Sequence, residues 1–176
     1  MLRMVSATTA LVVLVPEAEA LVKAYRDKYD PSAAEGMPAH ITVLYPFKKL
    51  DHMGEDVVAN LHSLFSQHPC FHFSLGEIQR FPTALYLAPR PETPFQMLTR
   101  AVAGQYLETP PYGGAFSAIV PHLTIAQDTD AHRLDEIRDA FQRASGGNLP
   151  IRGYAERVWL MVKDGRWRPQ LSFALA

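Results

Sequence analysis

The sequence contains one cysteine and no long apolar segment, and both shortages exclude classes of protein. Cys70 alone cannot form an internal disulfide, so a disulfide scaffold is excluded and a reducing compartment, the cytoplasm, is expected. No stretch approaches the roughly 20 apolar residues of a membrane-spanning helix, so we expect no membrane association. The apolar run at 10–15 is short and is followed by Glu17 and Glu19, which favours a strand over a secretion signal.

The chain also lacks an excess of charge of either sign. Its 17 basic and 18 acidic residues give a formal net charge of -1, so no general electrostatic field attracts long nucleic acids. An RNA ligand would have to be small or be held by a local basic patch. A basic cluster does lie at 152–168, although clusters of this kind are more often a solvated face.

What is present is the composition of a folded protein. Of the 176 residues, 48% are hydrophobic and 20% are charged, which is typical of compact domains rather than of disordered chains. This length suffices for one domain with a full core, or for two small lobes that share one. We therefore expect a single domain over 1–176, with approximate lobes at 1–90 and 91–176.

Strand and helix patterns mix along the whole chain, which predicts an α+β fold. Helix starts are indicated at Pro16 and at Thr93, where Thr93 is predicted to cap a helix, Pro94 to take its first position and Gln96 to close a capping box. Apolar residues at helical spacing predict two more helices, at 57–65 and 134–141. Apolar runs and alternation predict strands at 11–15, 39–47, 71–75, 85–87, 119–126, 158–162 and 171–175.

Two short segments, nearly half a chain apart, repeat one pattern. Pro38-Ala39-His40-Ile41-Thr42-Val43 and Val120-Pro121-His122-Leu123-Thr124-Ile125 share Pro, His, an apolar residue, Thr and an apolar residue. Each copy lies on a predicted strand between predicted helices, which indicates an internal duplication. The repeat therefore predicts two similar halves related by a pseudo-twofold axis, with their sheets side by side.

Strand geometry places the polar residues of each copy on one face. Alternate side chains of a strand point the same way, so His40 and Thr42 share a face, as do His122 and Thr124. The intervening apolar residues face the core. A twofold arrangement would direct the four polar groups toward a common point, where an anion with tetrahedral oxygens would fit.

These residue types suit phosphodiester chemistry. Two histidines can divide the work of general acid and general base near neutral pH, because the unperturbed imidazole pKa lies there. A threonine hydroxyl can donate to a phosphoryl oxygen and stabilise the negative charge of a pentavalent transition state. The pattern therefore predicts hydrolysis that needs neither a metal nor a cofactor.

At these residues the sequence resembles the two-histidine (2H) phosphoesterase superfamily, in its branch called the 2′-5′ RNA ligase family. The resemblance rests on the paired motifs and is supported by Leu44-Tyr45-Pro46-Phe47 and Pro111-Tyr112-Gly113-Gly114. It implies a bilobal α+β fold, a pseudo-twofold duplication with two antiparallel sheets around a central cleft and helices on the outside.

The resemblance also implies an activity. It is the opening of 2′,3′-cyclic or related cyclic phosphates of nucleotides or RNA ends, with possible ATP-independent 2′-5′ RNA ligation by reversal. The implied roles are general acid and base for His40 and His122, and phosphate binding for Thr42 and Thr124. No residue implies a metal, a cofactor or an obligate protein partner.

Other readings stay open beside this one. The alternative function is a non-catalytic module that binds a nucleotide or an RNA-end phosphate. Tyr45, Tyr112 and Trp167 could stack on a base, but each is predicted as a packing residue, and alternation places Tyr45 on the face opposite the histidines. The spacing of histidines and cysteine at 68–72 fits no standard zinc site, and 113–114 reads as a turn.

Overall fold

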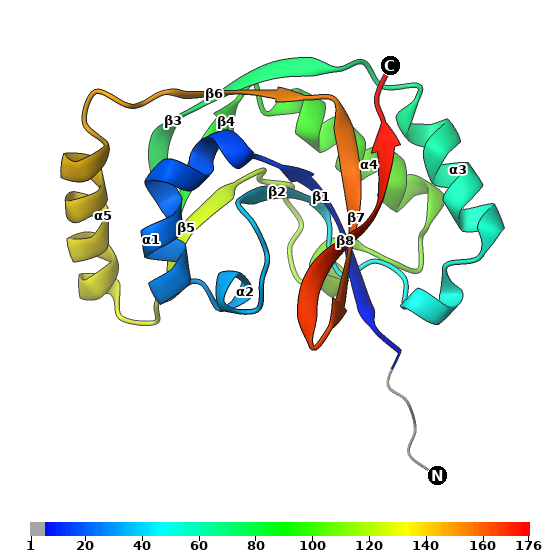
Figure 1. Ribbon diagram of the computed structural model, residues 1–176, viewed down its shortest axis with the longest axis horizontal. Helices are drawn as coiled ribbons and strands as arrows, with labels where there is room; N and C mark the ends of the chain where they lie inside the picture. Colours follow the sequence, from blue (N-terminus) through cyan, green and yellow to red (C-terminus); the bar gives the residue numbers. More distant parts are fainter. Residues whose placement is uncertain (1–5) are drawn as a thin grey trace, which may run out of the picture.

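The computed structural model describes residues 6–176 as an α+β protein with two four-stranded antiparallel sheets (Figure 1). The first sheet has the order β2-β1-β7-β8 and the second has the order β5-β4-β3-β6. The prediction of an α+β fold with two antiparallel sheets is confirmed. The strands are β1 (Thr8–Leu14), β2 (His40–Leu44), β3 (Phe71–Phe81), β4 (Ala84–Arg90), β5 (Leu123–Gln127), β6 (Ile151–Ala155), β7 (Arg157–Asp164) and β8 (Arg166–Ala174).

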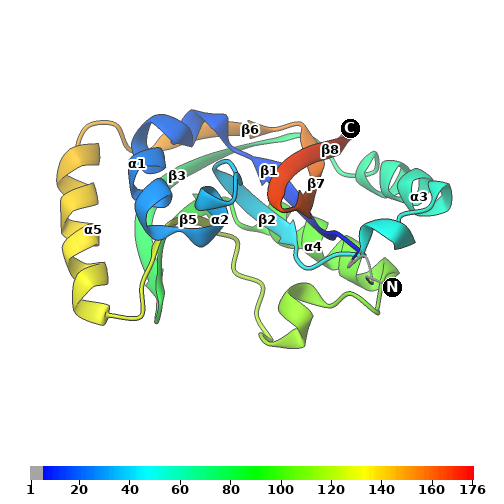
Figure 2. The same ribbon diagram turned by 60° about the horizontal axis from the view of Figure 1, so that its bottom comes forward.

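Helices flank the sheets, with α5 and α3 at opposite ends of the molecule (Figures 1 and 2). The α-helices are α1 (Glu19–Tyr29), α2 (Pro31–Ala34), α3 (Glu55–Phe65), α4 (Thr93–Gln105) and α5 (Ala131–Ser145). Single 3-10 turns occur at Pro16–Ala18, Leu50–His52 and Pro111–Gly114. Within residues 6–176, no helix is both long enough and apolar enough to cross a membrane.

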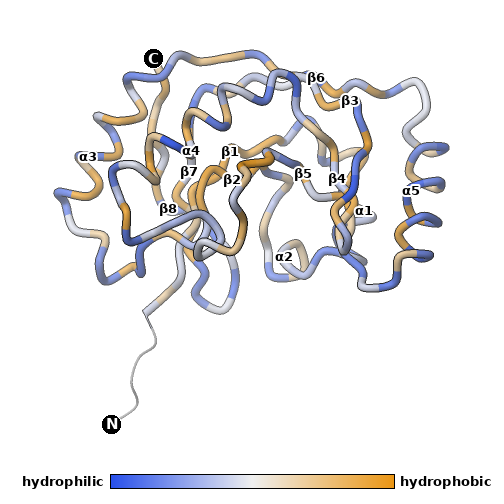
Figure 3. The backbone as a smooth tube through the Cα atoms, turned by 180° about the vertical axis from the view of Figure 1, so that it is seen from behind, coloured by the Kyte–Doolittle hydropathy of each residue, from blue (hydrophilic) through white to orange (hydrophobic). Residues whose placement is uncertain are grey.

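The core forms because the central strands are apolar on both faces. All interior residues of β1 are buried, and β1 pairs with β2 on one side and with β7 on the other. Figure 3 shows the hydrophobic colours concentrated along β1 and β2. One large cluster of buried residues connects the two sheets and the helices, while a smaller cluster that includes Val12, Met37 and Trp167 lies on the other face of β1 and β7.

The duplicated pattern corresponds to two units with the same order of elements. The first unit is β1-α1-β2, the second is β4-α4-β5, and each motif strand lies at the edge of its sheet. Helix α1 of the first unit packs on β5, helix α4 of the second packs on β2, and β2 also contacts β5. The two motif strands are therefore brought together across the boundary between the sheets.

The approximate lobes at 1–90 and 91–176 do not coincide with the two sheets. Strands β3 and β4 come from the first half of the chain and lie in the second sheet, whereas β7 and β8 come from the second half and join β1. The two halves of the chain therefore exchange strands between the two sheets.

Local predictions differ from the structure at several places. The capping box at 93–96 was wrong: the N-cap is Glu92, whose carbonyl accepts from the Gln96 backbone, and the Gln96 side chain instead donates to the Ile119 carbonyl at 3.1 Å. The strands expected at 39–47 and 119–126 are shorter, β2 and β5. Strand β6 has no counterpart among the predictions.

Candidate active site

A cleft of about 340 Å³ opens where β2 meets β5, and all four predicted site residues line it. His40 is the first residue of β2 and His122 directly precedes β5. Thr42 pairs across the first sheet with Val12, and Thr124 pairs across the second sheet with Tyr86. The structure thus brings the two His-x-Thr motifs into one cavity, while their roles in catalysis stay a prediction.

Both imidazoles are oriented by the same hydrogen bond. The Nδ1 atom of His40 lies 2.8 Å from the Pro38 carbonyl oxygen, and Nδ1 of His122 lies 2.8 Å from the Val120 carbonyl oxygen. A carbonyl oxygen only accepts, so each Nδ1 carries a proton and donates. In the neutral ring Nε2 is then the free nitrogen, which can take a proton as a base or, once protonated, give it as an acid.

Burial lowers the pKa of both histidines. Desolvation lowers the pKa of His40 to about 4, with smaller lowering from the charges of Arg26 and His122, while the Pro38 carbonyl and Asp30 raise it. Desolvation also lowers the pKa of His122, against the raising influence of the Val120 carbonyl and Asp30. With these lowered pKa values both imidazoles are neutral near pH 7, and a bound anion would favour their protonation.

A buried ion pair forms part of the cleft wall. Arg26 Nε donates to Asp30 Oδ2 at 3.1 Å, and the two side chains are only 3% and 1% exposed. Arg26 Nη2 also donates to the Met37 carbonyl, while Asp30 Oδ1 accepts from the backbone and hydroxyl of Ser32. The pair holds the segment that connects α1 to β2, and Asp30 itself lines the cleft.

Sequence reasoning missed this pair, although a signal was present. Arg26 lies four positions after Val22, on the stripe of α1 that faces the core. A charged residue on an apolar stripe requires a partner, and Asp30 is one helical turn further on.

Comparison with known proteins decides the family. The sequence model described as the 2′-5′ RNA ligase superfamily matches residues 14–167. The chain belongs to the 2′-5′ RNA ligase superfamily. It is 30% identical over 156 residues to a Bacillus cereus (strain G9842) protein classed by name as a phosphoesterase, with 85% of this chain and 86% of the relative covered.

Solved structures share the fold of this superfamily member. Escherichia coli LigT in complex with 3′-AMP superposes with a TM-score of 0.64 at 17% identity, covering 98% of this chain and 99% of LigT. The protein TT0787 of Thermus thermophilus also gives a TM-score of 0.64 at 17% identity, covering 96% of this chain and 97% of TT0787. At this identity the structures show a common fold.

Three aromatic residues of this 2′-5′ RNA ligase superfamily chain line the cleft: Tyr45, Tyr112 and Trp167. The prediction that Tyr45 lies on the face away from the histidines was wrong, because β2 ends at Leu44 and strand alternation no longer applies at Tyr45. Tyr45 packs edge-on against Trp167 with ring centroids 6.0 Å apart. Trp167 is mostly buried, so packing remains part of its role.

Tyr112 lies in a strained turn beside the motif. Its φ of 52° is left-handed, as are the φ angles of the following Gly113 and Gly114, and this conformation costs a non-glycine residue roughly 1–2 kcal/mol. The Tyr112 backbone donates to the Tyr45 carbonyl at 2.6 Å. Burial raises the pKa of Tyr112, and a hydrogen bond with the Thr42 side chain opposes that rise.

The remaining candidates from the sequence lie apart from the cleft or contribute little to it. Of the basic cluster at 152–168, only Lys163 lines the cleft, where it pairs with Glu35 at 2.7 Å. Among residues 6–176, no three His, Cys, Asp or Glu side chains are grouped so that they could hold a metal ion.

Proposed function

We propose that this superfamily member is a cyclic phosphodiesterase that opens 2′,3′-cyclic or related cyclic phosphates of nucleotides or RNA ends by His/His acid–base catalysis without a metal. The observation that carries the proposal is the pair of imidazoles in one cleft, each with its Nδ1 bonded to a carbonyl and its Nε2 free. Two such groups on one ligand match the proton transfers of an in-line displacement at phosphorus.

The proposed reaction uses the four motif residues together. One neutral imidazole takes a proton from water through Nε2 as the water oxygen attacks phosphorus. The bond from phosphorus to one ribose oxygen breaks, and the protonated partner gives its proton to that oxygen. The hydroxyls of Thr42 and Thr124 donate to the non-bridging oxygens, whose negative charge grows in the transition state.

The electrostatics of the cleft support this scheme. Because the pKa of each histidine is lowered, a neutral base is available at and below pH 7. A phosphodiester brings one negative charge and favours protonation of the other ring, so the substrate helps to create the acid. A site built only for phosphate binding would be better served by arginine, which stays charged.

Nucleotides are the ligand class that the cleft suits. Its aromatic residues offer faces for a base, and its threonines offer donors for a phosphate. Crystal structures of LigT, which has this fold, include complexes with 3′-AMP, ATP and NADP+. With a 5′-hydroxyl in place of water, the same arrangement would join two RNA ends through a 2′-5′ linkage without ATP.

Turnover of a substrate panel in the presence of excess chelator tests the proposal. The panel contains 2′,3′-cyclic mononucleotides, oligonucleotides with cyclic ends and ADP-ribose cyclic phosphate, with the products mapped by chromatography. We expect a monoester product at an unchanged rate after chelation. Activity that is lost in chelator and restored by a divalent metal would place the mechanism in another class. Binding without turnover of any substrate would favour the non-catalytic module.

A further inference from the structure

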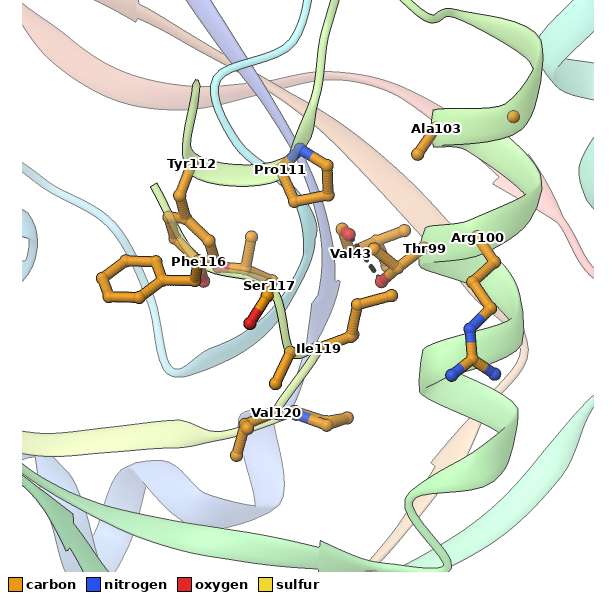
Figure 4. A pocket seen from close by; sticks show the side chains of 14 residues that line it. Val43, Thr99, Arg100, Ala103, Pro111, Tyr112, Phe116, Ser117, Ile119 and Val120 are labelled. Carbon is orange, nitrogen blue, oxygen red and sulfur yellow. Dashed lines mark hydrogen bonds between the residues drawn. The ribbon is translucent and has the colours of Figure 1, made fainter. Parts of the chain in front are cut away.

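A second pocket, here called the α4 pocket, adjoins the catalytic cleft. It has a volume of about 360 Å³ and lies between α4 and the segment 111–121. Figure 4 shows Thr99, Arg100 and Ala103 of α4 on one side, and Pro111, Tyr112 and Phe116 on the other. Thr42 and Tyr112 line both cavities, so the α4 pocket begins at one of the proposed phosphate-binding hydroxyls.

Three hydrogen bonds hold the walls of this pocket in place. Thr99 Oγ1 donates to the Val43 carbonyl at 2.7 Å, which fixes α4 to β2 (Figure 4). Gln96 fixes the Ile119 carbonyl to the start of α4. At the other end of the segment 111–121, the backbone N–H of Tyr112 donates to the Tyr45 carbonyl. The pocket therefore exists before any ligand binds, which is the usual condition of a small-molecule site.

The mouth of the α4 pocket is unusually apolar for a surface. Phe116 is 70% exposed and packs edge-on against Tyr112, with ring centroids 5.8 Å apart. Val120, which provides the carbonyl that orients His122, is also exposed there. Exposed apolar groups gathered at one cavity mark a binding site more often than scattered ones do, and aromatic faces suit an unstacked nucleobase.

One positively charged side chain, Arg100, also lines the α4 pocket. Arg100 is exposed at its rim, and within residues 6–176 its guanidinium has neither an ion-pair nor a hydrogen-bond partner. A free guanidinium beside an apolar cavity matches a ligand that carries a base and a phosphate.

We propose that the α4 pocket binds a second nucleoside of an RNA-end substrate, with Arg100 contacting a phosphate of that strand. The inference rests on the proposed substrate class and narrows it: the preferred substrate is an oligonucleotide with a cyclic end, and a cyclic mononucleotide fills only the catalytic cleft. Because Thr42 lines both cavities, the α4 pocket adjoins the proposed site of the reacting phosphate, and the second nucleoside is the one joined through the 5′ oxygen of the terminal ribose.

The test compares one nucleotide with two, in two independent readouts. The first is kcat/KM for adenosine 2′,3′-cyclic phosphate and for the dinucleotide ApA with a 2′,3′-cyclic end. The second is the Kd for adenosine 3′-monophosphate and for the dinucleotide ApAp, which are not cyclic diesters and need no turnover. Stacking of one base is worth about 5- to 150-fold in affinity, so we expect a preference for the dinucleotide of about 5-fold or more in each readout.

Variants assign this preference to the pocket. Phe116→Ala should bring the dinucleotide-to-mononucleotide ratio close to one, and Arg100→Gln should lower it and weaken its dependence on salt. Leu107→Ala is the matched control, because Leu107 is an exposed apolar residue that does not line the pocket, and it should leave the ratio unchanged.

The outcomes separate this inference from the proposed function. Equal values for one and two nucleotides in the wild-type protein, or equal effects of Phe116→Ala and Leu107→Ala, would overturn the inference even if cyclic phosphates are hydrolysed. Absence of turnover together with a Phe116-dependent preference in Kd would support the inference and reject the catalytic assignment.

Discussion

The protein surrounds His40 with charge and His122 with aromatic rings. Among the groups that act on His40 are Arg26 and Asp30, a buried ion pair, which influence its pKa in opposite directions. His122 packs edge-on against Phe81 at 5.1 Å and against Tyr86 at 5.6 Å. The hydrogen bond from Nδ1 to the carbonyl two residues earlier is the same in both copies.

The difference indicates which features the duplicated site requires. The shared features fix the tautomer and place the hydroxyl beside the ring. The surroundings differ. Desolvation lowers the pKa of both rings, and the charge of Arg26 lowers the pKa of His40 further but is not among the causes that act on His122. Two rings of the same sequence motif can in this way differ in proton affinity, as an acid and a base must.

Removal of either ring should have the largest effect on activity. His40→Ala and His122→Ala should each lower kcat by about 10²-fold or more. The double variant should lose no more activity than the less active of the two single variants, since groups that act as a unit show their full cost when one of them is removed. Rates would be measured on a cyclic phosphate, with His132→Ala on the exposed face of α5 as control. Wild-type activity in either single variant would contradict the shared site.

Disruption of the ion pair should have the largest effect on stability. Asp30→Asn leaves Arg26 charged and buried, which typically costs about 3–5 kcal/mol. The matched control is Asp27→Asn on the same helix, where the pair with Lys23 is exposed and is worth about 0.2–1 kcal/mol. Urea denaturation measures both. Equal losses would mean that the surroundings of His40 are not set by buried charge.

The stability of the protein should decrease as the pH is lowered, and His40 should account for part of this decrease. Its folded pKa of about 4 lies below the unfolded value near 6.5, so the unfolded state binds more protons between these limits. The free energy of unfolding should therefore decrease as pH falls from about 6.5 to about 4, and His40 should account for about 1–3 kcal/mol of that decrease.

Denaturation of the wild type and of His40→Gln at several pH values, without phosphate in the buffer, measures this contribution. The His40→Gln protein should lose less stability over the range, whereas His132→Gln should behave as the wild type does. An identical pH dependence in His40→Gln would show that the neutral ring of His40 is not favoured in the folded state.

The smallest predicted effect distinguishes the two threonines. Thr42→Val and Thr124→Val each remove one neutral donor, so each should lower kcat/KM by about 5- to 30-fold, from a loss of about 1–2 kcal/mol. Thr42→Val should cost less, because Tyr112 lines the same cleft as Thr42 and its hydroxyl is expected to supply a substitute donor. Adding Tyr112→Phe should remove the advantage. A loss from Thr42→Val that exceeds that from Thr124→Val would reject this role for Tyr112.

The sequence predicts the parts of the fold that depend on local pattern. The motif strands follow from alternation, and α5 follows from the helical spacing of Leu134, Ile137 and Phe141, all buried as expected. Strand exchange between the halves is not predictable in this way, since pairing of β1 with β7 joins residues far apart in the chain. β6 gives a weak signal because its central inward position is Gly153, where a Cβ would overlap the Phe73 ring.

The candidate site also divides into residues that a local pattern predicts and residues whose positions depend on tertiary contacts. His40, Thr42, His122 and Thr124 are found from the repeat alone, because the pattern occurs twice and in register. The Arg26–Asp30 pair has a weaker signal. Arg26 falls on the apolar stripe of α1, but the charged residues around it resemble an exposed helix face, so tertiary contacts are needed to show that the pair is buried. The placement of Tyr45 in the cleft depends on where β2 ends, and strand ends are the least certain part of a pattern-based prediction.

The pairing of β1 with β7 also determines when the site can form during synthesis. Thr8 is opposite Lys163 in this ladder, so the sheet that positions His40 stays incomplete until residues 157–164 have left the ribosome. Contacts of such large sequence separation form late in folding, because the chain must first close a long loop. A nascent chain that already contains both histidines, but not yet residues 157–164, is therefore expected to have no complete cleft between β2 and β5.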